Sequence, residues 1–242
     1  MSKKYIPTIN ISSLIKNNFE TQRAFKTIKE IEKACIKVGF FQITGHGINL
    51  KVIKKTCGVG NKFFNLPDSK KRKLSPKKWN KKNPDISSAA FSRLKTLSTL
   101  RFNYYPNQTK PVEISKQDGV ALGCETHVDS GIFTLLYQDR KGGLQVQNRK
   151  NKKWYDVPFN KKALVVNTGR ALEFLSKGKF KATNHRVLWN KSKRLSVPFF
   201  FEPSYDFKMN QSFLNGSKFK NNGPIYEKFL NKSLKKFIEY QR

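Results

Sequence analysis

Three side chains that can bind a metal are so far apart in the sequence that they can share one ion only if the fold brings distant strands together. His127 and Asp129 form an HxD pair, and His185 follows 56 positions after Asp129. Residues i and i+2 of an extended segment point the same way, so His127 and Asp129 can reach one ion. Two imidazoles and one carboxylate can occupy one face of an octahedral Fe(II) ion and leave the other face open. The pattern therefore predicts a mononuclear iron site, with His185 arriving from a second strand.

A second motif follows the last of these residues. Arg194 lies nine positions after His185, and Ser196 lies two positions further on. Arginine offers a planar fork to a carboxylate, and a hydroxyl two residues along a strand points to the same side. HxD alone is a weak signal because the tripeptide often occurs by chance. HxD, a distant His and then RxS, in this order, form a much stronger signal.

Helical patterns come first in the chain and short strands follow. The expected elements are a helix over 25–38, a strand over 40–44, a helix over 50–65, short strands from 97 onward with turns at 141–143 and 148–151, a helical turn inside the barrel over 169–177, and a last helix over 225–240. The apolar members of the two long helices are Phe25, Ile28, Ile31, Ile36 and Val38, then Val52, Ile53, Phe63 and Phe64. Such an order predicts an α+β chain with a double-stranded β-helix (jelly-roll) core, N-terminal helices and a short C-terminal helix.

Length and composition fit one structural unit. We expect residues 1–96 to pack on the barrel, residues 97–203 to form the core and residues 204–242 to form a tail with a helix. The 242 residues contain no run of 18 apolar residues and no signal-peptide pattern, so we expect a cytoplasmic protein without a membrane span. Cys35, Cys57 and Cys124 are an odd set without paired spacing, which indicates reduced thiols. Cys124 is expected to pack in a strand and not to bind metal.

The chain is strongly basic, with 49 Lys and Arg residues against 16 Asp and Glu residues. This excess is typical of proteins that bind nucleic acid or another polyanion. It is also typical of AT-rich codon usage, because 39 of the basic residues are Lys and only 10 are Arg. Arg is the residue preferred for bidentate phosphate and base contacts. We therefore favour codon usage and a small-molecule substrate, one that the positive field attracts if it is anionic, over a nucleic-acid partner.

The motifs recur in the order found in one enzyme family. They are IPTIN (6–10), GFFQITGHG (39–47), FFNLP (63–67), LRFNYYP (100–106), THVDS (126–130), GGLQV (142–146), WYDVP (154–158), ALVVNTG (163–169), TNHRV (183–187) and RLSVPFFFEP (194–203). Together they resemble the isopenicillin N synthase-like 2-oxoglutarate/Fe(II) dioxygenases. The resemblance runs from about residue 6 to 203, with a weak stretch between 74 and 97.

The resemblance implies roles for particular residues. His127, Asp129 and His185 match the three ligands of Fe(II). Arg194 and Ser196 match the pair that holds the distal carboxylate of 2-oxoglutarate, and Asn103 and Tyr105 match the pair beside this co-substrate. Phe200 lies where some members stack an aromatic substrate, although the run of three phenylalanines is also compatible with core filling. His46 matches a structural position of the N-terminal segment.

The implied activity is the oxidation, by default the hydroxylation, of a substrate with release of succinate and CO2. Desaturation and ring closure remain open, as do ascorbate as a further cofactor, the substrate and the oligomeric state. One alternative is an Fe(II) oxidase of the isopenicillin synthase or ethylene-forming type, which does not use 2-oxoglutarate. The other is a basic nucleic-acid-binding protein on a dioxygenase scaffold, and it would require a damaged metal triad.

Two departures from the family matter. The segment between 68 and 96, where relatives carry longer substrate-covering structure, is short and basic. Specificity for plant hormones or flavonoids should therefore not be transferred to this chain. Arg170 stands where the family has an acidic residue after the Asn-x-Gly motif, which puts the local helix cap in doubt.

Overall fold

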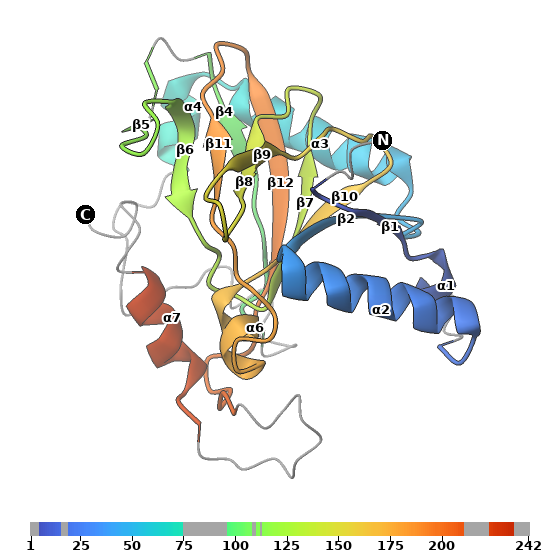
Figure 1. Cartoon of the computed structure of the whole chain (residues 1–242). Helices are drawn as coiled ribbons and strands as arrows, with labels where there is room; N and C mark the ends of the chain where they lie inside the picture. Colours follow the sequence, from blue (N-terminus) through green and yellow to red (C-terminus); the bar gives the residue numbers. More distant parts are fainter. Residues whose placement is uncertain are drawn as a thin grey trace.

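Two β-sheets form the centre of this computed structural model, which describes residues 5–15, 19–74, 96–107, 110–111, 113–210 and 223–234 (Figure 1). The strands of the larger sheet are β1 (Thr8–Asn10), β2 (Phe40–Thr44), β10 (Leu164–Thr168), β7 (Phe133–Gln138), β12 (Arg194–Phe201) and β3 (Thr99–Leu100), in this order, with β4 (Asn103–Tyr105) also paired to β12. The smaller sheet contains β5 (Glu113–Ile114), β6 (Ala121–His127), β11 (His185–Leu188), β8 (Leu144–Gln147) and β9 (Trp154–Asp156).

The strand pairs are antiparallel, apart from the parallel pair of β1 and β2. Strands that neighbour one another in space are mostly distant in the chain, such as β7 with β10 and β12, and β11 with β6 and β8. Alternation of successive core strands between two sheets is the connectivity of a jelly roll. The predicted α+β class and jelly-roll core are therefore confirmed.

Strands β2 and β10 are buried on both faces, which explains their nearly unbroken apolar sequences. Phe40 and Val165 point into the cluster between the two sheets. Phe41 and Val166, on the opposite face, belong to the cluster that includes Ala34 and Cys35 of the long N-terminal helix. Each fully buried side chain of this size contributes about 1.5–3 kcal/mol to folding. β2 therefore ties the N-terminal region to the core by strand pairing as well as by packing.

Helix α2 (Gln22–Lys37) lies along the larger sheet (Figure 1). Thr21 caps its first turn by accepting a hydrogen bond from the Ala24 amide. The chain leaves the helix through Gly39 at φ 72°, a conformation that glycine adopts without strain. The predicted helix is confirmed, and Ile31 and Val38 pack in the core as expected, but the other three predicted apolar members were wrong. Its buried members are Ala24, Thr27, Ala34 and Cys35, whereas Phe25, Ile28 and Ile36 are exposed. Small residues allow the helix backbone to approach the sheet closely.

Helix α3 (Leu50–Phe64) matches the second expected helix and begins at Asn49, whose side chain accepts from the Lys51 amide. Phe64 stacks on Tyr104 of β4 at 4.8 Å between ring centroids. Val52 and Phe63 are exposed, contrary to the expected apolar set. Two short helices complete this part of the chain: α1 (Ser12–Ile15) precedes α2, and α4 (Asp68–Lys73) follows α3. Most of the weak stretch of the resemblance, residues 75–95, lies outside the described residues.

A third cluster lies at one end of the sheets, where α6 (Arg170–Leu175) meets α7 (Tyr226–Leu234) (Figure 1). Ala171 and Leu175 pack there against Met209, Tyr226 and Leu230. The helical turn expected inside the barrel is thus a helix at the end of the barrel, because its apolar side meets the C-terminal segment. The predicted final helix is confirmed for its first half. Residues 235–242 lie outside the described residues.

The division into residues 1–96, 97–203 and 204–242 stays a prediction. Strand β2 belongs to the same sheet as the core strands, so the first region shares the sheet of the second. In the part of the chain that the structure describes, every helix is too short or too polar to cross a membrane.

Candidate metal centre

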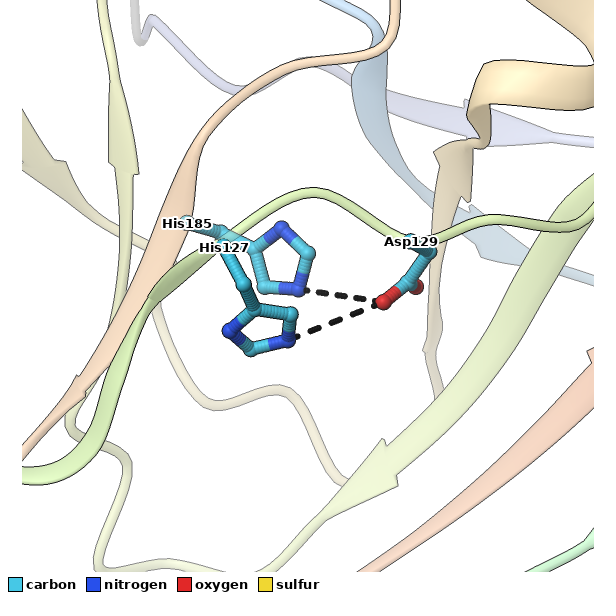
Figure 2. Close-up of side chains that lie close together, drawn as sticks. All are labelled: His127, Asp129 and His185. Atoms are coloured by element: carbon cyan, nitrogen blue, oxygen red, sulfur yellow. Dashed lines mark ion pairs between the residues drawn. The ribbon is translucent and has the colours of Figure 1, made fainter. Parts of the chain in front are cut away.

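The structure brings His127, Asp129 and His185 together (Figure 2). His127 ends β6 and His185 begins β11, and the two residues are direct partners across the antiparallel pair. Asp129 follows two positions after the end of β6. Its Oδ1 lies 3.7 Å from Nε2 of His127 and 3.6 Å from Nε2 of His185. One potential ligand atom from each residue lies within 4.8 Å of the others, so the three can face one ion.

Both imidazole rings are held by the nitrogen that faces away from this point. Nδ1 of His127 lies 2.8 Å from the carbonyl oxygen of Glu125, and Nδ1 of His185 lies 3.2 Å from that of Thr183. A carbonyl oxygen only accepts, so each Nδ1 carries the hydrogen and donates it. Nε2 is then the ring nitrogen of each imidazole that faces the ion position, and its lone pair is available to a metal when this nitrogen carries no proton.

The two carboxylate oxygens of Asp129 have different partners. Its Oδ2 accepts hydrogen bonds from Oγ1 of Thr134 at 2.5 Å and from Nδ2 of Asn167 at 2.7 Å. Its Oδ1 remains directed at the two imidazoles. Thr134 lies on β7 and Asn167 on the neighbouring strand β10, opposite one another in the sheet. Neither residue was predicted from the sequence as part of the site, although Asn167 belongs to the ALVVNTG motif (163–169).

A close backbone contact holds the loop that follows Asp129. A Cβ atom on Gly169 would overlap the carbonyl of Gly131, so only glycine allows this approach. The amides of Arg170 and Ala171 then donate to the carbonyl oxygens of Asp129 and Ser130 at 2.8 and 3.0 Å. The first amides of α6 are thus satisfied by the backbone, and no side-chain cap is needed. Helix α6 forms with Arg170 at its first position.

Electrostatics favour an anionic Asp129. Burial opposes its charged form, but the two imidazoles and the hydrogen bonds from Thr134 and Asn167 outweigh this and lower the pKa of Asp129. Burial and the neighbouring His127 lower the pKa of His185 to about 4, against the attraction of Asp129. Burial also lowers the pKa of His127, but contacts with Cys124, Asp129 and the Glu125 carbonyl raise it to about 9. A metal cation would therefore displace one proton, from His127.

The outer side of β11 is fixed by an ion pair next to His185. Arg186 is 2% exposed, and its guanidinium lies 2.8 Å from Oδ2 of Asp118 and 4.0 Å from the ring centroid of Trp154. Successive side chains of a strand point to opposite faces, so Arg186 points away from the metal position. The buried, paired arginine anchors the strand that carries His185.

A buried arginine lies further along the larger sheet. Nε of Arg194 donates to the carbonyl oxygen of Gly142 at 2.7 Å, and Nη1 donates to Oγ of Ser196 at 3.1 Å. Nη2 is buried, and no described residue accepts a hydrogen bond from it. A buried cation without an anionic partner is unfavourable, and removing a partner from such a charge costs several kcal/mol. The guanidinium of Arg194 therefore has a buried donor with which a carboxylate could form a hydrogen bond and an ion pair.

Strand pairing places the other expected co-substrate residues beside this arginine. Tyr105 is the partner of Arg194 and Asn103 is the partner of Ser196 across β4 and β12. The guanidinium carbon of Arg194 lies 4.6 Å from the Tyr105 ring centroid. Burial raises the pKa of Tyr105 to about 12, although the charge and hydrogen bonding of Arg194 oppose the rise. Tyr105 is therefore a neutral hydroxyl in the physiological range.

The remaining candidates are placed as follows. Phe200 lies on β12, six positions after Arg194 and on the same face of the strand by alternation. Phe201, on the other face, is 40% exposed and stacks on Phe133, so the run of phenylalanines is not uniformly core. His46 lies outside the cluster, and its Nδ1 accepts from the Ile48 amide. Cys124 packs against the core, with its sulfur 3.9 Å from Nδ1 of His127.

Family models match most of the chain. The model of the 2OG-Fe(II) oxygenase superfamily matches residues 96–203. The model described as the non-haem dioxygenase in morphine synthesis N-terminal region matches residues 6–118. The first match contains all three candidate ligands and the Arg194–Ser196 pair. The second contains α2, β2 and α3.

Curated relatives are similar over comparable lengths. Gibberellin 2-beta-dioxygenase 8 of Arabidopsis thaliana is 28% identical over 263 residues, which covers 83% of this chain and 75% of that protein. The 2-oxoglutarate-dependent dioxygenase citB of Monascus ruber is 26% identical over 292 residues, which covers 86% of this chain and 88% of that protein.

Solved structures show the same fold. A full-length Neurospora crassa protein, solved in complex with alpha-KG and 5-formyluracil, has a TM-score of 0.73 at 21% identity, over 95% of both chains. The rice dioxygenase for auxin oxidation has a TM-score of 0.71 at 18% identity, also over 95% of both chains. The family models, the named relatives and the assembled His-Asp-His cluster agree: this chain belongs to the 2-oxoglutarate/Fe(II) oxygenase superfamily, as a non-haem dioxygenase that uses Fe(II) and 2-oxoglutarate.

Proposed function

We propose that this dioxygenase holds Fe(II) with His127, Asp129 and His185, holds 2-oxoglutarate with Arg194 and its neighbours, and hydroxylates a small molecule. The donor set of two imidazoles and one carboxylate suits Fe(II) and leaves positions for a chelating ligand and O2. When bound, Fe(II) and 2-oxoglutarate supply O2 activation with release of succinate and CO2.

The buried guanidinium of Arg194 is the observation that carries the co-substrate assignment. Its Nη2 is buried without an acceptor among the described residues, and Ser196 and Tyr105 lie beside it. A carboxylate bound here would gain charge-assisted hydrogen bonds and would neutralise the buried cation. Relatives named as 2-oxoglutarate-dependent dioxygenases support 2-oxoglutarate as the source of this carboxylate, over the alternative of an Fe(II) oxidase without it.

The side chains around the metal position have distinct tasks. The carbonyls of Glu125 and Thr183 orient the imidazoles, while Thr134 and Asn167 orient the carboxylate of Asp129. The hydroxyl of Tyr105 stays protonated, since its pKa is about 12, and can donate to a bound carboxylate. Orientation and exclusion of water are what the protein adds to such chemistry.

Several observations support a small-molecule substrate. Relatives are named for gibberellin and for feruloyl CoA, both of them small organic molecules. Phe200 shares a strand face with Arg194 and is a candidate contact for the substrate. The nucleic-acid alternative required a damaged metal triad, and the triad is assembled.

An anaerobic titration tests the proposal. We expect Fe(II) followed by 2-oxoglutarate to produce the weak visible band of the chelate, and Arg194→Ala to require much more 2-oxoglutarate for the same band. Coupled succinate release in air then identifies substrates. A protein that binds Fe(II) without the band, and that oxidises a substrate without succinate, would support the oxidase alternative.

A further inference from the structure

A small cavity lies beside the segments that carry all three metal-binding side chains. It has a volume of about 180 Å³, and Val128 and Asn184 are part of its wall. Val128 lies between His127 and Asp129, whose side chains meet at the metal position, and Asn184 precedes His185 in the chain. The cavity therefore borders the segments that carry the candidate ligands.

Three exposed basic residues from two separate elements line this cavity. Arg149 and Lys152 come from the turn between β8 and β9, and Arg170 comes from the first position of α6. One carboxylate, that of Glu173, also lines the cavity and lies 3.9 Å from Arg149. In the part of the chain that the structure describes, neither Lys152 nor Arg170 forms an ion pair. The cations therefore outnumber the carboxylates by two.

The basic residues at this cavity are richer in Arg than those of the chain as a whole. Only 10 of the 49 basic residues of the chain are Arg, yet two of the three cations around the cavity are Arg. The guanidinium fork binds two oxygens of a phosphate or carboxylate at once, which the lysine ammonium cannot do. The residues at this cavity therefore have the chemistry of anion recognition, unlike the lysine-rich remainder of the surface.

The size of the cavity restricts the ligand. One water takes about 30 Å³ of the liquid, so 180 Å³ corresponds to roughly six waters. Cavities for drug-sized molecules measure about 300–1,000 Å³. The space thus suits one small oxyanion, or one charged end of a larger molecule.

Backbone hydrogen bonds connect the cavity to the metal centre. The amide of Arg170 donates to the carbonyl oxygen of Asp129 at 2.8 Å. Gln147 of β8 lines the cavity, and its backbone amide donates to the carbonyl oxygen of Asn184, next to His185, at 2.9 Å. An anion held by Arg170 would therefore restrain the loop that carries Asp129.

We propose that this cavity is a binding site for a small oxyanion, a phosphate or carboxylate group, held by Arg149, Lys152 and Arg170. The site goes beyond the proposed oxidation of a small molecule. It does not depend on the metal or on 2-oxoglutarate, because none of its three cations takes part in either site. The anion is either a separate molecule or the charged end of the substrate.

Calorimetric titration of the full chain with inorganic phosphate tests the site. At 0.15 M ionic strength, diffuse attraction to the basic surface is screened within about 8 Å. We expect saturable binding at one site, weakened roughly tenfold by Arg170→Gln or Arg149→Gln, since a charge-assisted hydrogen bond contributes about that factor. Glu173→Gln should strengthen binding severalfold, because it removes the carboxylate from the cavity.

Arg140→Gln is the matched control. Arg140 is exposed in the turn between β7 and β8, so its loss should leave phosphate binding unchanged. Absence of saturable binding, or equal effects of Arg140→Gln and Arg170→Gln, would overturn the proposal. Circular dichroism and thermal unfolding confirm that each variant is folded.

Kinetics distinguishes the two sources of the anion once a substrate has been found by succinate release. If the substrate carries the charge, Arg170→Gln raises its KM and phosphate competes with it. If the anion is separate, phosphate does not compete and KM is unchanged. The phosphate titration needs no turnover, so failure of the proposed oxidation and failure of this site are separate results.

Discussion

At the scale of single residues, each candidate metal ligand is oriented by a contact on the side away from the ion. His127 and His185 use their Nδ1 hydrogens for backbone carbonyls, and Asp129 uses Oδ2 for Thr134 and Asn167. These contacts fix the ligand geometry before any metal binds, which reduces the entropy lost on binding.

Removal of any one ligand should abolish the reaction. We expect alanine at His127, Asp129 or His185 to eliminate iron-dependent decarboxylation of 2-oxoglutarate, measured as succinate formation. His46→Ala should retain turnover, because His46 lies outside the cluster. If His46 proved as essential as His127 for iron binding, the ligand assignment would be wrong.

The hydroxyl of Thr134 should matter for metal affinity. Thr134→Val keeps the shape of the side chain but leaves Oδ2 of Asp129 with one hydrogen bond fewer. Loss of such a partner typically lowers metal affinity about 10- to 100-fold. Anaerobic Fe(II) titration measures this, with Thr99→Val as the control, because among the described residues the Thr99 hydroxyl donates to the nearby Leu97 carbonyl and not to the metal site. An unchanged affinity would exclude an orienting role for Thr134.

Arg194→Lys separates charge from geometry at the co-substrate site. Lysine keeps the positive charge but cannot present two parallel donors to a carboxylate. We expect the apparent KM for 2-oxoglutarate to rise about tenfold, while the exposed Arg140→Lys leaves it unchanged. A KM that does not move would mean that Arg194 does not hold the distal carboxylate, and the oxidase alternative would gain support.

At the scale of elements, a buried tyrosine links the C-terminal helix to the residue that follows β12. The hydroxyl of Tyr226, in α7, donates to Oε2 of Glu202 at 2.9 Å. Tyr226 is fully buried, and it packs on α6. Burial raises the pKa of Glu202 to about 7, and the charge of Asp129 adds to the rise, while the hydrogen bond from Tyr226 opposes it. The helix is therefore docked on a carboxyl group that titrates near neutrality.

This pKa makes stability depend on pH. An unfolded glutamate has a pKa near 4.5, so between about pH 4.5 and 7 the folded chain holds a proton that the unfolded chain releases. Stability from this group is therefore lost as pH rises through 7. Relative to Glu202→Gln, the free energy of unfolding of the wild-type chain should fall by roughly 1–3 kcal/mol between pH 5 and pH 8. Denaturant unfolding checks this, and parallel pH curves would contradict it.

At the scale of the whole molecule, the main question is whether the net charge of +33 has a function. Helix α4 carries Lys70, Lys71, Arg72 and Lys73, and Lys71 pairs with Asp68 at 2.8 Å. Lys77 and Lys78, in the same basic stretch, lie outside the described residues. Exposed lysines spread over the surface produce a diffuse field that salt screens readily.

We expect a weak dependence on salt. If the basic stretch bound a polyanion through six phosphate contacts, affinity would fall on the order of a thousandfold between 50 and 200 mM salt. Anisotropy of a labelled DNA duplex and the rate of succinate release should both change far less. A steep dependence that disappears when the six basic residues at 70–73, 77 and 78 are neutralised would make nucleic acid the leading substrate candidate.

The sequence by itself determined the elements and the groups whose spacing follows from local geometry. The HxD pair predicts an extended segment whose first and third side chains point the same way, and Arg194 and Ser196 follow the same alternation. The apolar runs of β2 and β10 indicate strands that are buried on both faces. The triad could be recognised because two imidazoles and a carboxylate are the residue types that suit Fe(II). The prediction that His185 would come from a second strand is met by the pairing of β11 with β6.

Only the tertiary structure decided which distant residues form hydrogen bonds to the candidate metal ligands. Thr134 and Asn167 lie 5 and 38 positions from Asp129, and the pairing of β7 with β10 brings them to the same oxygen. The same holds for the buried side of α2, where small residues lie against the sheet, and for the cavity lined by Arg149 and Arg170. The physical reason is that these contacts depend on long-range strand pairing and close packing, which leave no periodic signal in the local sequence.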